Sequence, residues 1–364
     1  MALNKNILLI SCYKEPNTIL EMSLADWDLL IRQARRANLL AVLTFRLDDA
    51  KLLGAVPERP RSHLATQQLV ARRHVEAVKW EVTCIRDALQ TAEQFTLLLK
   101  GAAYTIRALN ACKGRLFSDV DILVSETTLP KVEQALTDQG WESDKLDSYD
   151  QAYYRKWMHE IPPMTHTKRG TTIDVHHNIL PKTVKSVPSA DKLMADAIPV
   201  HGWEGVYTLS NVDMVLHSMT HLFYEGELEH GLRDLVDLDA LLNQFGEQDS
   251  NFWEGIGPRA AALNLSLPLY YGIRFTSRIL GTNIPPFVHD AAEKGKPVFP
   301  VLMDFLFSRA LMPDHPSCND AFTGFARWAL YVRSHYLRMP IYLLFPHLVR
   351  KAWRQRFDKD TTLA

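Results

Sequence analysis

The sequence predicts an α+β protein in which a mixed β-sheet core lies between two helical regions. Three observations support this prediction. Apolar residues recur every three to four positions from residue 18 to residue 95, short apolar runs bounded by glycine turns fill residues 96–200, and helical spacing returns from residue 201 onward. We therefore divide the chain into an N-terminal helical region (1–95), a core (96–200) and a C-terminal helical region with a basic, aromatic tail (201–364).

Composition narrows the class of protein. The chain carries 41 Lys plus Arg against 42 Asp plus Glu, and this balance argues against a basic surface that binds nucleic acid over its whole extent. The four cysteines stand far apart without a C-x-x-C pair, so we expect no zinc ribbon and no disulfide scaffold. The first residues make a poor signal peptide, and no apolar stretch approaches the roughly 20 residues that span a bilayer. A cytoplasmic location fits these features best.

The N-terminal region is predicted to contain two long helical stretches. The apolar spacing from Leu24 to Leu40 predicts the first, and Ser62 begins the second. Gly54, Pro57 and Pro60 mark the loop between them.

The core begins with a strand at 96–99, a tight turn at Lys100-Gly101 and a helix at 102–110. The following segments are, in order, a strand at 120–124, a helix at 129–139 that Thr128 caps and Gly140 ends, strand candidates at 152–158 and 163–166, and an apolar run at 171–176. In the C-terminal region, Ser210 precedes one helix and Gly231 a second.

A pair of acidic residues carries the chemistry. Asp119 and Asp121 flank Val120, and residues two apart on a strand share a face, so both carboxylates project to the same side. Two adjacent carboxylates repel each other unless a cation lies between them, and Mg²⁺ (or Mn²⁺) prefers such hard oxygen ligands. The alternative is a pair of exposed aspartates at a strand end.

A third acid lies on the later strand. Ile173 and Val175 would face the core, which leaves Asp174 and His176 together on the other face and excludes His177 from it. Upstream, Gly101 permits close backbone approach where a helix start offers free N–H groups to a phosphate. Arg115 adds a fixed positive charge, or is simply a surface arginine in its loop. His159 and Glu160 are expected to line the strand edge near the site.

Four segments together resemble the nucleotidyltransferase superfamily: LLLKGA at 97–102, RxxSDVDILV at 115–124, Gly140-Trp141, and IDVHH at 173–177. They are most similar to an uncharacterised bacterial group that has LKG in place of the usual glycine-serine. The resemblance implies that Gly101 is the nucleotide-loop glycine and that Asp119, Asp121 and Asp174 hold two divalent metals. Ala102 stands where the usual serine would contact a phosphate.

The resemblance extends into two later helices. His217 and His221 lie four residues apart, and we favour His221 as a site residue because the resembling group also places a histidine on this helix. Asp237 approaches the active cleft, faces solvent or pairs with His221; the sequence leaves these alternatives open.

These residues suit a metal-dependent transferase that moves a nucleoside monophosphate from a nucleoside triphosphate to an acceptor hydroxyl and releases pyrophosphate. In this interpretation Lys100 and Arg115 offset the triphosphate charge, and Asp174 orients or deprotonates the hydroxyl. The acceptor is a small molecule, RNA or protein, and no motif selects among these. The alternative is a degenerate core that binds a nucleotide or a partner without turnover, which the missing serine would permit.

The basic, aromatic tail adds a separate hypothesis. From Ala321 to Phe357 there is no Asp or Glu, whereas arginines alternate with aromatic residues. This composition fits peripheral contact with anionic lipid or a docking surface for RNA. The alternative is a pair of helices packed on the core with basic outer faces.

Overall fold

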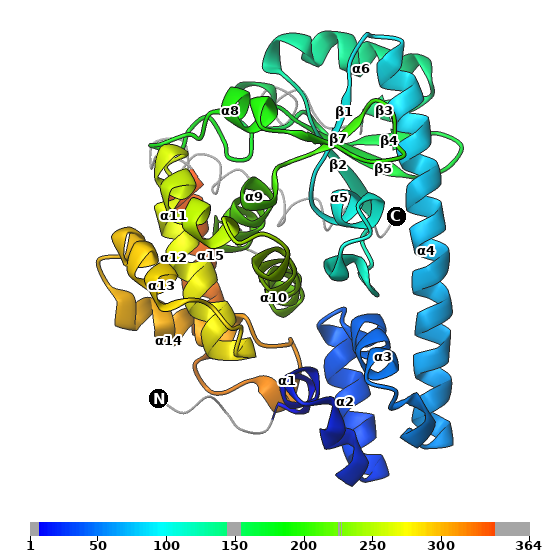
Figure 1. Ribbon diagram of the computed structural model, residues 1–364, viewed down its shortest axis with the longest axis vertical. Helices are drawn as coiled ribbons and strands as arrows, with labels where there is room; N and C mark the ends of the chain where they lie inside the picture. The colour runs from blue at the N-terminus through cyan, green and yellow to red at the C-terminus, as the bar shows by residue number, and fades with distance from the viewer. Residues whose placement is uncertain (1–6, 144–153, 225, 227, 339–364) are drawn as a thin grey trace, which may run out of the picture.

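The computed structural model describes residues 7–143, 154–224, 226 and 228–338. Within them, seven strands form one mixed sheet in the order β3-β4-β5-β2-β1-β7-β6 (Figure 1). The strands are β1 Thr96–Leu98, β2 Asp119–Leu123, β3 Trp141–Ser143, β4 Met164–His166, β5 Thr172–His176, β6 Ile198–Pro199 and β7 Val206–Thr208. The α+β class predicted from the sequence is confirmed. The sheet also includes β7, which follows residue 200, the end of the expected core segment.

The strands at the centre of the sheet have mixed directions. β1 runs antiparallel to β2 and parallel to β7, while β2 runs parallel to β5. All three residues of β1 are buried, as are the last four of β2. Both strands therefore lie in the interior, although β2 carries Asp119 and Asp121 among its apolar residues.

Three helices accompany the sheet: α5 Lys100–Ile106, α6 Leu129–Asp138 and α8 Ala190–Ala195. Gly140 has φ +98°, a left-handed conformation that favours glycine, so the predicted stop after α6 is confirmed. Two expectations were wrong in detail. α5 ends before residue 110, because Ala108 also adopts positive φ, and residues 154–157 of the strand candidate 152–158 are helical. Residues 152 and 153 lie outside the described residues.

The N-terminal region folds as α1 Leu8–Lys14, α2 Leu24–Arg36, α3 Leu40–Asp49 and α4 Glu58–Gln90. Ser23 and Asp26 form a reciprocal capping box that fixes the start of α2. α4 begins before Ser62, so Pro60 lies in its first turn rather than in the preceding loop. Proline is tolerated there because the first N–H groups of a helix have no partner within it.

α4 connects the N-terminal helices to the sheet. It packs against α2 and α3 near one end and against α5, α6 and β1 near the other, and both views show it running along one side of the molecule (Figure 1). Glu81 of α4 is buried. Its two carboxylate oxygens accept hydrogen bonds from Nε and Nη2 of Arg169, at 2.9 and 3.0 Å. It also accepts a hydrogen bond from Thr171 Oγ1 at 2.8 Å, so α4 is attached to the turn that precedes β5.

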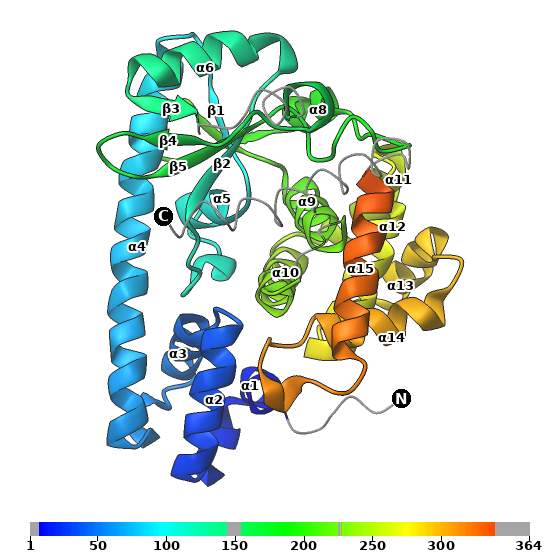
Figure 2. The same ribbon diagram turned by 180° about the vertical axis from the view of Figure 1, so that it is seen from behind.

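The C-terminal region consists of α9 Asn211–Tyr224, α10 Gly231–Gln248, α11 Phe252–Ala262, α12 Ser266–Phe275, α13 Pro286–Ala292, α14 Pro300–Ala310 and α15 Thr323–Arg338. α9 and α10 lie between the sheet and the remaining helices (Figure 2). Ser210 Oγ accepts a hydrogen bond from the Asp213 N–H at 3.2 Å, which confirms the predicted cap of α9. An aromatic core joins α9, α12 and α14 through Phe223, Tyr271, Phe275 and Phe307.

Short one-turn segments connect these elements. They are η1 Pro16–Glu21, η2 Leu53–Ala55, η3 Asn110–Cys112, η4 Glu126–Thr128, the π-helical η5 Thr276–Leu280, η6 Glu293–Gly295 and η7 Pro316–Cys318. Among the helices of the described residues, none combines the length and the apolar character that crossing a membrane requires.

Candidate functional site

Three carboxylates meet on two paired strands. Asp121 of β2 lies directly opposite Asp174 of β5 in the parallel register, and Asp119 precedes Asp121 by two residues on the same face. One oxygen from each of the three lies within 4.8 Å of the others. We call Asp119, Asp121 and Asp174 the carboxylate cluster. The alternation of β2 and the parallel pairing with β5 therefore suffice to assemble it.

Lys100 and His176 both contact Asp121. The sharp turn from β1 into α5 occurs at Lys100, whose φ is +44°, and its Nζ lies 2.8 Å from Asp121 Oδ1. The Nε2 atom of His176 lies 3.0 Å from the same oxygen. Burial alone would raise the pKa of Asp121, but Lys100 and His176 outweigh it and hold that pKa well below its ordinary value. Asp121 is therefore ionised, and both of these contacts reach Oδ1 rather than Oδ2.

Asp174 is less well compensated. Its Oδ1 is buried and has no hydrogen-bond partner among the described residues. Burial, together with the charges of Asp121 and Glu160, raises the pKa of Asp174 to about 7. A buried carboxylate oxygen without a partner, beside two further carboxylates, is an arrangement that a divalent cation would stabilise.

Gly101 lies against an aromatic ring. A Cβ atom at this position would come within 2.6 Å of Cδ1 and 2.8 Å of Cε1 of Phe117, a separation that real Cβ atoms do not reach. Phe117 also packs edge-on against His74 of α4, with ring centroids 4.6 Å apart. The close approach that glycine permits here is therefore to Phe117, a residue that we did not select from the sequence although it lies two positions before Asp119.

Arg115 belongs to a second group of charges. Its guanidinium is buried, donates from Nε to Asp237 Oδ2 at 2.6 Å, and lies 3.4 Å from Asp234 Oδ1. Asp234 also pairs with Arg233 at 2.8 Å and lies 4.0 Å from Nδ1 of His221. We call these five residues the Arg115 cluster. Asp237 is thus paired with Arg115, an alternative that the sequence did not suggest.

His217 interacts electrostatically with both clusters: with Lys100, His176 and Asp121, and with His221. Burial, with a smaller contribution from Lys100 and His221, holds its pKa well below the ordinary value, so the imidazole is neutral. Of the two histidines on α9, the sequence favoured His221, whereas His217 is the one near Asp121. The spacing of four residues placed both on one face but did not indicate which turn of α9 faces the carboxylates.

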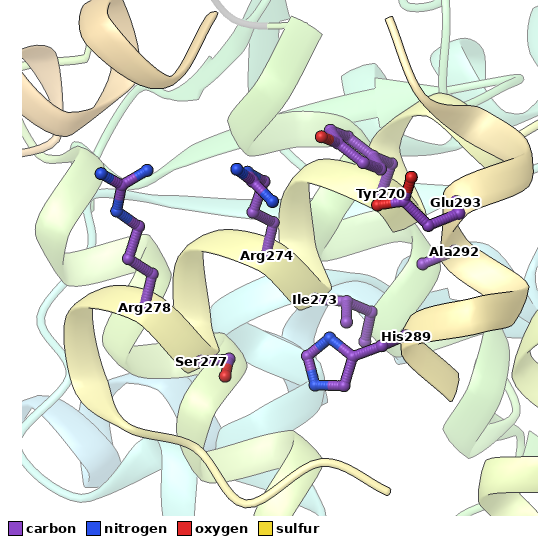
Figure 3. A pocket seen from close by; sticks show the side chains of 8 residues that line it. All are labelled: Tyr270, Ile273, Arg274, Ser277, Arg278, His289, Ala292 and Glu293. Carbon is purple, nitrogen blue, oxygen red and sulfur yellow. The ribbon is translucent and has the colours of Figure 1, made fainter. Parts of the chain in front are cut away.

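Two cavities lie away from the carboxylate cluster. One, of about 330 Å³, is bordered by α12, η5 and α13; Tyr270, Arg274 and Arg278 line one side of it and His289 another (Figure 3). Its two arginines pair with Asp304, at 2.5 and 3.1 Å. The second, of about 420 Å³, lies between the N-terminal helices and α10 and includes Asp237 in its lining. Since neither cavity is lined by the three carboxylates, the carboxylates themselves, rather than a large cavity, define the candidate site.

Comparison with known proteins identifies one family. The family model described as an uncharacterised nucleotidyltransferase matches residues 23–281, which is well over half of the chain. The match includes the N-terminal helices from α2 onward, the whole sheet and the helices through η5. No curated protein and no solved structure matches the chain.

Proposed function

The chain belongs to this family of uncharacterised nucleotidyltransferases, and from that premise we propose that it transfers a nucleoside monophosphate from a nucleoside triphosphate to an acceptor hydroxyl with release of pyrophosphate. The observation that supports this proposal most directly is the carboxylate cluster. Family membership alone gives the general class of transferase, whereas three acids on paired strands supply the ligands that metal-dependent phosphoryl chemistry needs.

In this proposal Asp119, Asp121 and Asp174 hold Mg²⁺ or Mn²⁺. A bound divalent cation would neutralise phosphate oxygens and stabilise the charge that develops on the leaving pyrophosphate. The residues present fit such an ion: Asp121 is ionised, its Oδ2 is not used by Lys100 or His176, and Asp174 Oδ1 is an unpartnered buried oxygen.

The neighbouring residues would act on the nucleotide and the acceptor. Lys100 is a half-buried cation beside the cluster and would move from Asp121 to a phosphate oxygen. His176 keeps Asp121 oriented through its Nε2. Gly101 and Arg115 remain candidates for nucleotide contact, although Phe117 packs against the first and two carboxylates already pair with the second. His221 and Asp237 would act only through the Arg115 cluster.

The test is pyrophosphate release by the purified full chain. It is incubated with each labelled triphosphate, Mg²⁺ or Mn²⁺ and a cell extract as the source of acceptor, and the labelled product is identified. Asp121→Asn and Asp174→Asn should each lower the rate by roughly a hundredfold or more, because a neutral group cannot supply the charge. Asp138→Asn is the matched control, since Asp138 is exposed at the end of α6. Equal rates for all four proteins would remove the carboxylate cluster from the reaction.

One observation favours nucleotide binding without transfer. Ala102, which stands in place of the usual serine, is buried at 1% exposure, so its methyl group offers neither a hydroxyl nor access to a phosphate. Triphosphate affinity that survives without pyrophosphate release, for every triphosphate and with the extract present, would support this second candidate. The same assay therefore separates the two.

We also propose that α15 contacts an anionic membrane surface. Phe325, Trp328, Val332 and Tyr336 recur at helical spacing and are all between 44% and 61% exposed. The same segment has no Asp or Glu from Ala321 to Phe357. Exposed aromatic residues next to an excess of basic ones suit the interface of an anionic bilayer.

The described basic residues of α15 also have partners within the protein. Arg327 pairs with Asp314, and Arg333 donates to the Phe223 carbonyl at 3.0 Å. These contacts fit the packed helix that the sequence analysis left open as an alternative, and the rest of the tail lies outside the described residues. The proposed lipid contact therefore depends on the exposed apolar face of α15 formed by Phe325, Trp328, Val332 and Tyr336.

Co-sedimentation with vesicles tests the lipid contact. Binding to phosphatidylcholine vesicles should increase when they contain phosphatidylserine, and the double substitution Phe325→Ser with Trp328→Ser should abolish it. Trp80→Ser is the control, because Trp80 is equally exposed, at 64%, on the distant α4. Absence of binding, or the same loss with Trp80→Ser, would refute this contact.

A further inference from the structure

A second group of possible metal ligands lies beside the carboxylate cluster. His159, Glu160 and His176 each offer one ligand atom, and these three atoms lie within 4.8 Å of one another. Glu160 is paired with His176 through an isolated antiparallel β-bridge, so their side chains are held next to each other. The Nδ1 atom of His176 lies 3.4 Å from Glu160 Oε2, and the rings of His159 and His176 are 5.2 Å apart.

Two ring nitrogens of this group are unsatisfied. Nδ1 of His159 and Nδ1 of His176 are both buried, and neither has a hydrogen-bond partner among the described residues. His176 is only 3% exposed. Buried polar atoms without partners are uncommon in native proteins, because each costs roughly 1–3 kcal/mol. Two such nitrogens beside one carboxylate form an arrangement that a bound cation would satisfy.

The chemistry of the three side chains selects the class of ligand. Two imidazoles and one carboxylate are typical of Zn²⁺ and related transition metals, whereas Mg²⁺ prefers oxygen ligands alone. Nδ1 of His159 is buried without a hydrogen-bond partner among the described residues, so it is available to a ligand. A proton on Nδ1 of His176 is the competing way to place positive charge next to Glu160.

We propose that His159, Glu160 and His176 bind a transition-metal ion of the Zn²⁺ class, at a site separate from the carboxylate cluster. His176 belongs to both groups, since its other nitrogen, Nε2, lies 3.0 Å from Asp121 Oδ1. A metal on one ring nitrogen and a carboxylate on the other form the carboxylate–histidine–metal arrangement that orients metal ligands in many proteins. The ion would hold the Nε2–H of His176 toward Asp121 and so position that carboxylate. This assignment does not require that the protein be a transferase.

The test measures metal binding directly. The full chain is stripped with a chelator and titrated with Zn²⁺ against a chromogenic competitor, and Co²⁺ serves as a spectroscopic probe of nitrogen and oxygen coordination. We expect one Zn²⁺ per chain. His159→Ala and the nearly isosteric Glu160→Gln should each weaken Zn²⁺ binding by about a hundredfold. Loss of even an outer-shell partner lowers metal affinity roughly 10–100-fold.

Matched variants separate this site from the carboxylate cluster. Asp119→Asn should retain Zn²⁺ binding while losing Mg²⁺ binding, and Glu160→Gln should show the reverse. His201→Ala, an exposed histidine elsewhere, should change neither. Unchanged Zn²⁺ affinity in both His159→Ala and Glu160→Gln would overturn the proposal. So would loss of Zn²⁺ binding in Asp119→Asn alone, because the metal would then belong to the carboxylate cluster.

Discussion

The carboxylate cluster and the Arg115 cluster both interact electrostatically with His217, yet their ion pairs differ. In the Arg115 cluster each carboxylate has an arginine partner, with Asp237 on Arg115 and Asp234 on both Arg115 and Arg233. In the carboxylate cluster Lys100 and His176 both pair with Asp121, and Asp174 Oδ1 has no partner among the described residues.

The difference separates a structural role from a binding role. The ion-pair network joins the segment before β2 to α10, and each of its carboxylates already has an arginine partner. Three acids close together, with one buried oxygen unpartnered, are costly in the protein alone and become favourable when a cation binds. Of the two charged groups, the carboxylate cluster is the one that a ligand would stabilise.

The largest effect on stability should come from Arg115→Met. This change leaves Asp237, which is almost fully buried, without its arginine partner and removes one of the two arginines beside Asp234. Breaking a buried pair in this way costs about 3–5 kcal/mol. Denaturant unfolding of the two proteins measures it. Arg32→Met is the control, because Arg32 pairs with Asp28 on an exposed helix face and should change stability by less than about 1 kcal/mol. A loss for Arg115→Met no larger than for the control would contradict the structural role.

Asp174→Asn should stabilise the protein, whereas Arg115→Met should destabilise it. Replacing an unsatisfied buried carboxylate by a neutral group should raise the free energy of unfolding, measured with a chelator present, by roughly 1–3 kcal/mol. Added Mg²⁺ should then raise the melting temperature of the native protein but not that of the variant. A destabilised variant would mean that Asp174 is a structural residue.

The stability gained by Asp174→Asn should also depend on pH. The ordinary pKa of this carboxyl is 3.8 and its pKa in the folded protein is about 7. Between these values the folded state binds more protons than the unfolded state, so the contribution of Asp174 to stability falls as pH rises and is least favourable above about pH 7. The advantage of Asp174→Asn should therefore be larger at about pH 8 than at about pH 5. Asp138→Asn, on the exposed end of α6, should show no such trend.

The smallest effect should come from the hydrogen bond that caps α9. Ser210→Ala removes the cap of α9 and should cost about 1 kcal/mol. Ser210→Gly should lower the free energy of unfolding by only about a few tenths of a kcal/mol relative to the native protein. Thermal unfolding of the two variants gives the scale against which the Arg115 and Asp174 effects are judged.

Sequence patterns within single segments predicted the faces of strands and the ends of helices. Alternation along β2 and β5 placed Asp119, Asp121 and Asp174 on one face, and Gly140 marked the end of α6. The ion pairs could not be predicted in this way, because Arg115 and Asp237 lie more than a hundred residues apart and meet only after α10 has packed. Phe117 and His217 were missed or ranked too low for a related reason. Phe117 packs against Gly101 of α5, and His217 interacts electrostatically with Asp121 of β2. Neither interaction can be read from the residue's own segment.

The attachment of α4 has a mechanical consequence. Its 33 residues span about 50 Å at the helical rise of 1.5 Å per residue, and Glu81 joins it through Arg169 and Thr171 to the turn from which β5 starts. A load applied to the N-terminal helices would be transmitted along α4 to Arg169 and Thr171, which lie three residues and one residue before β5, the strand that carries Asp174. The position of this acid would therefore be sensitive to whatever binds the N-terminal helices.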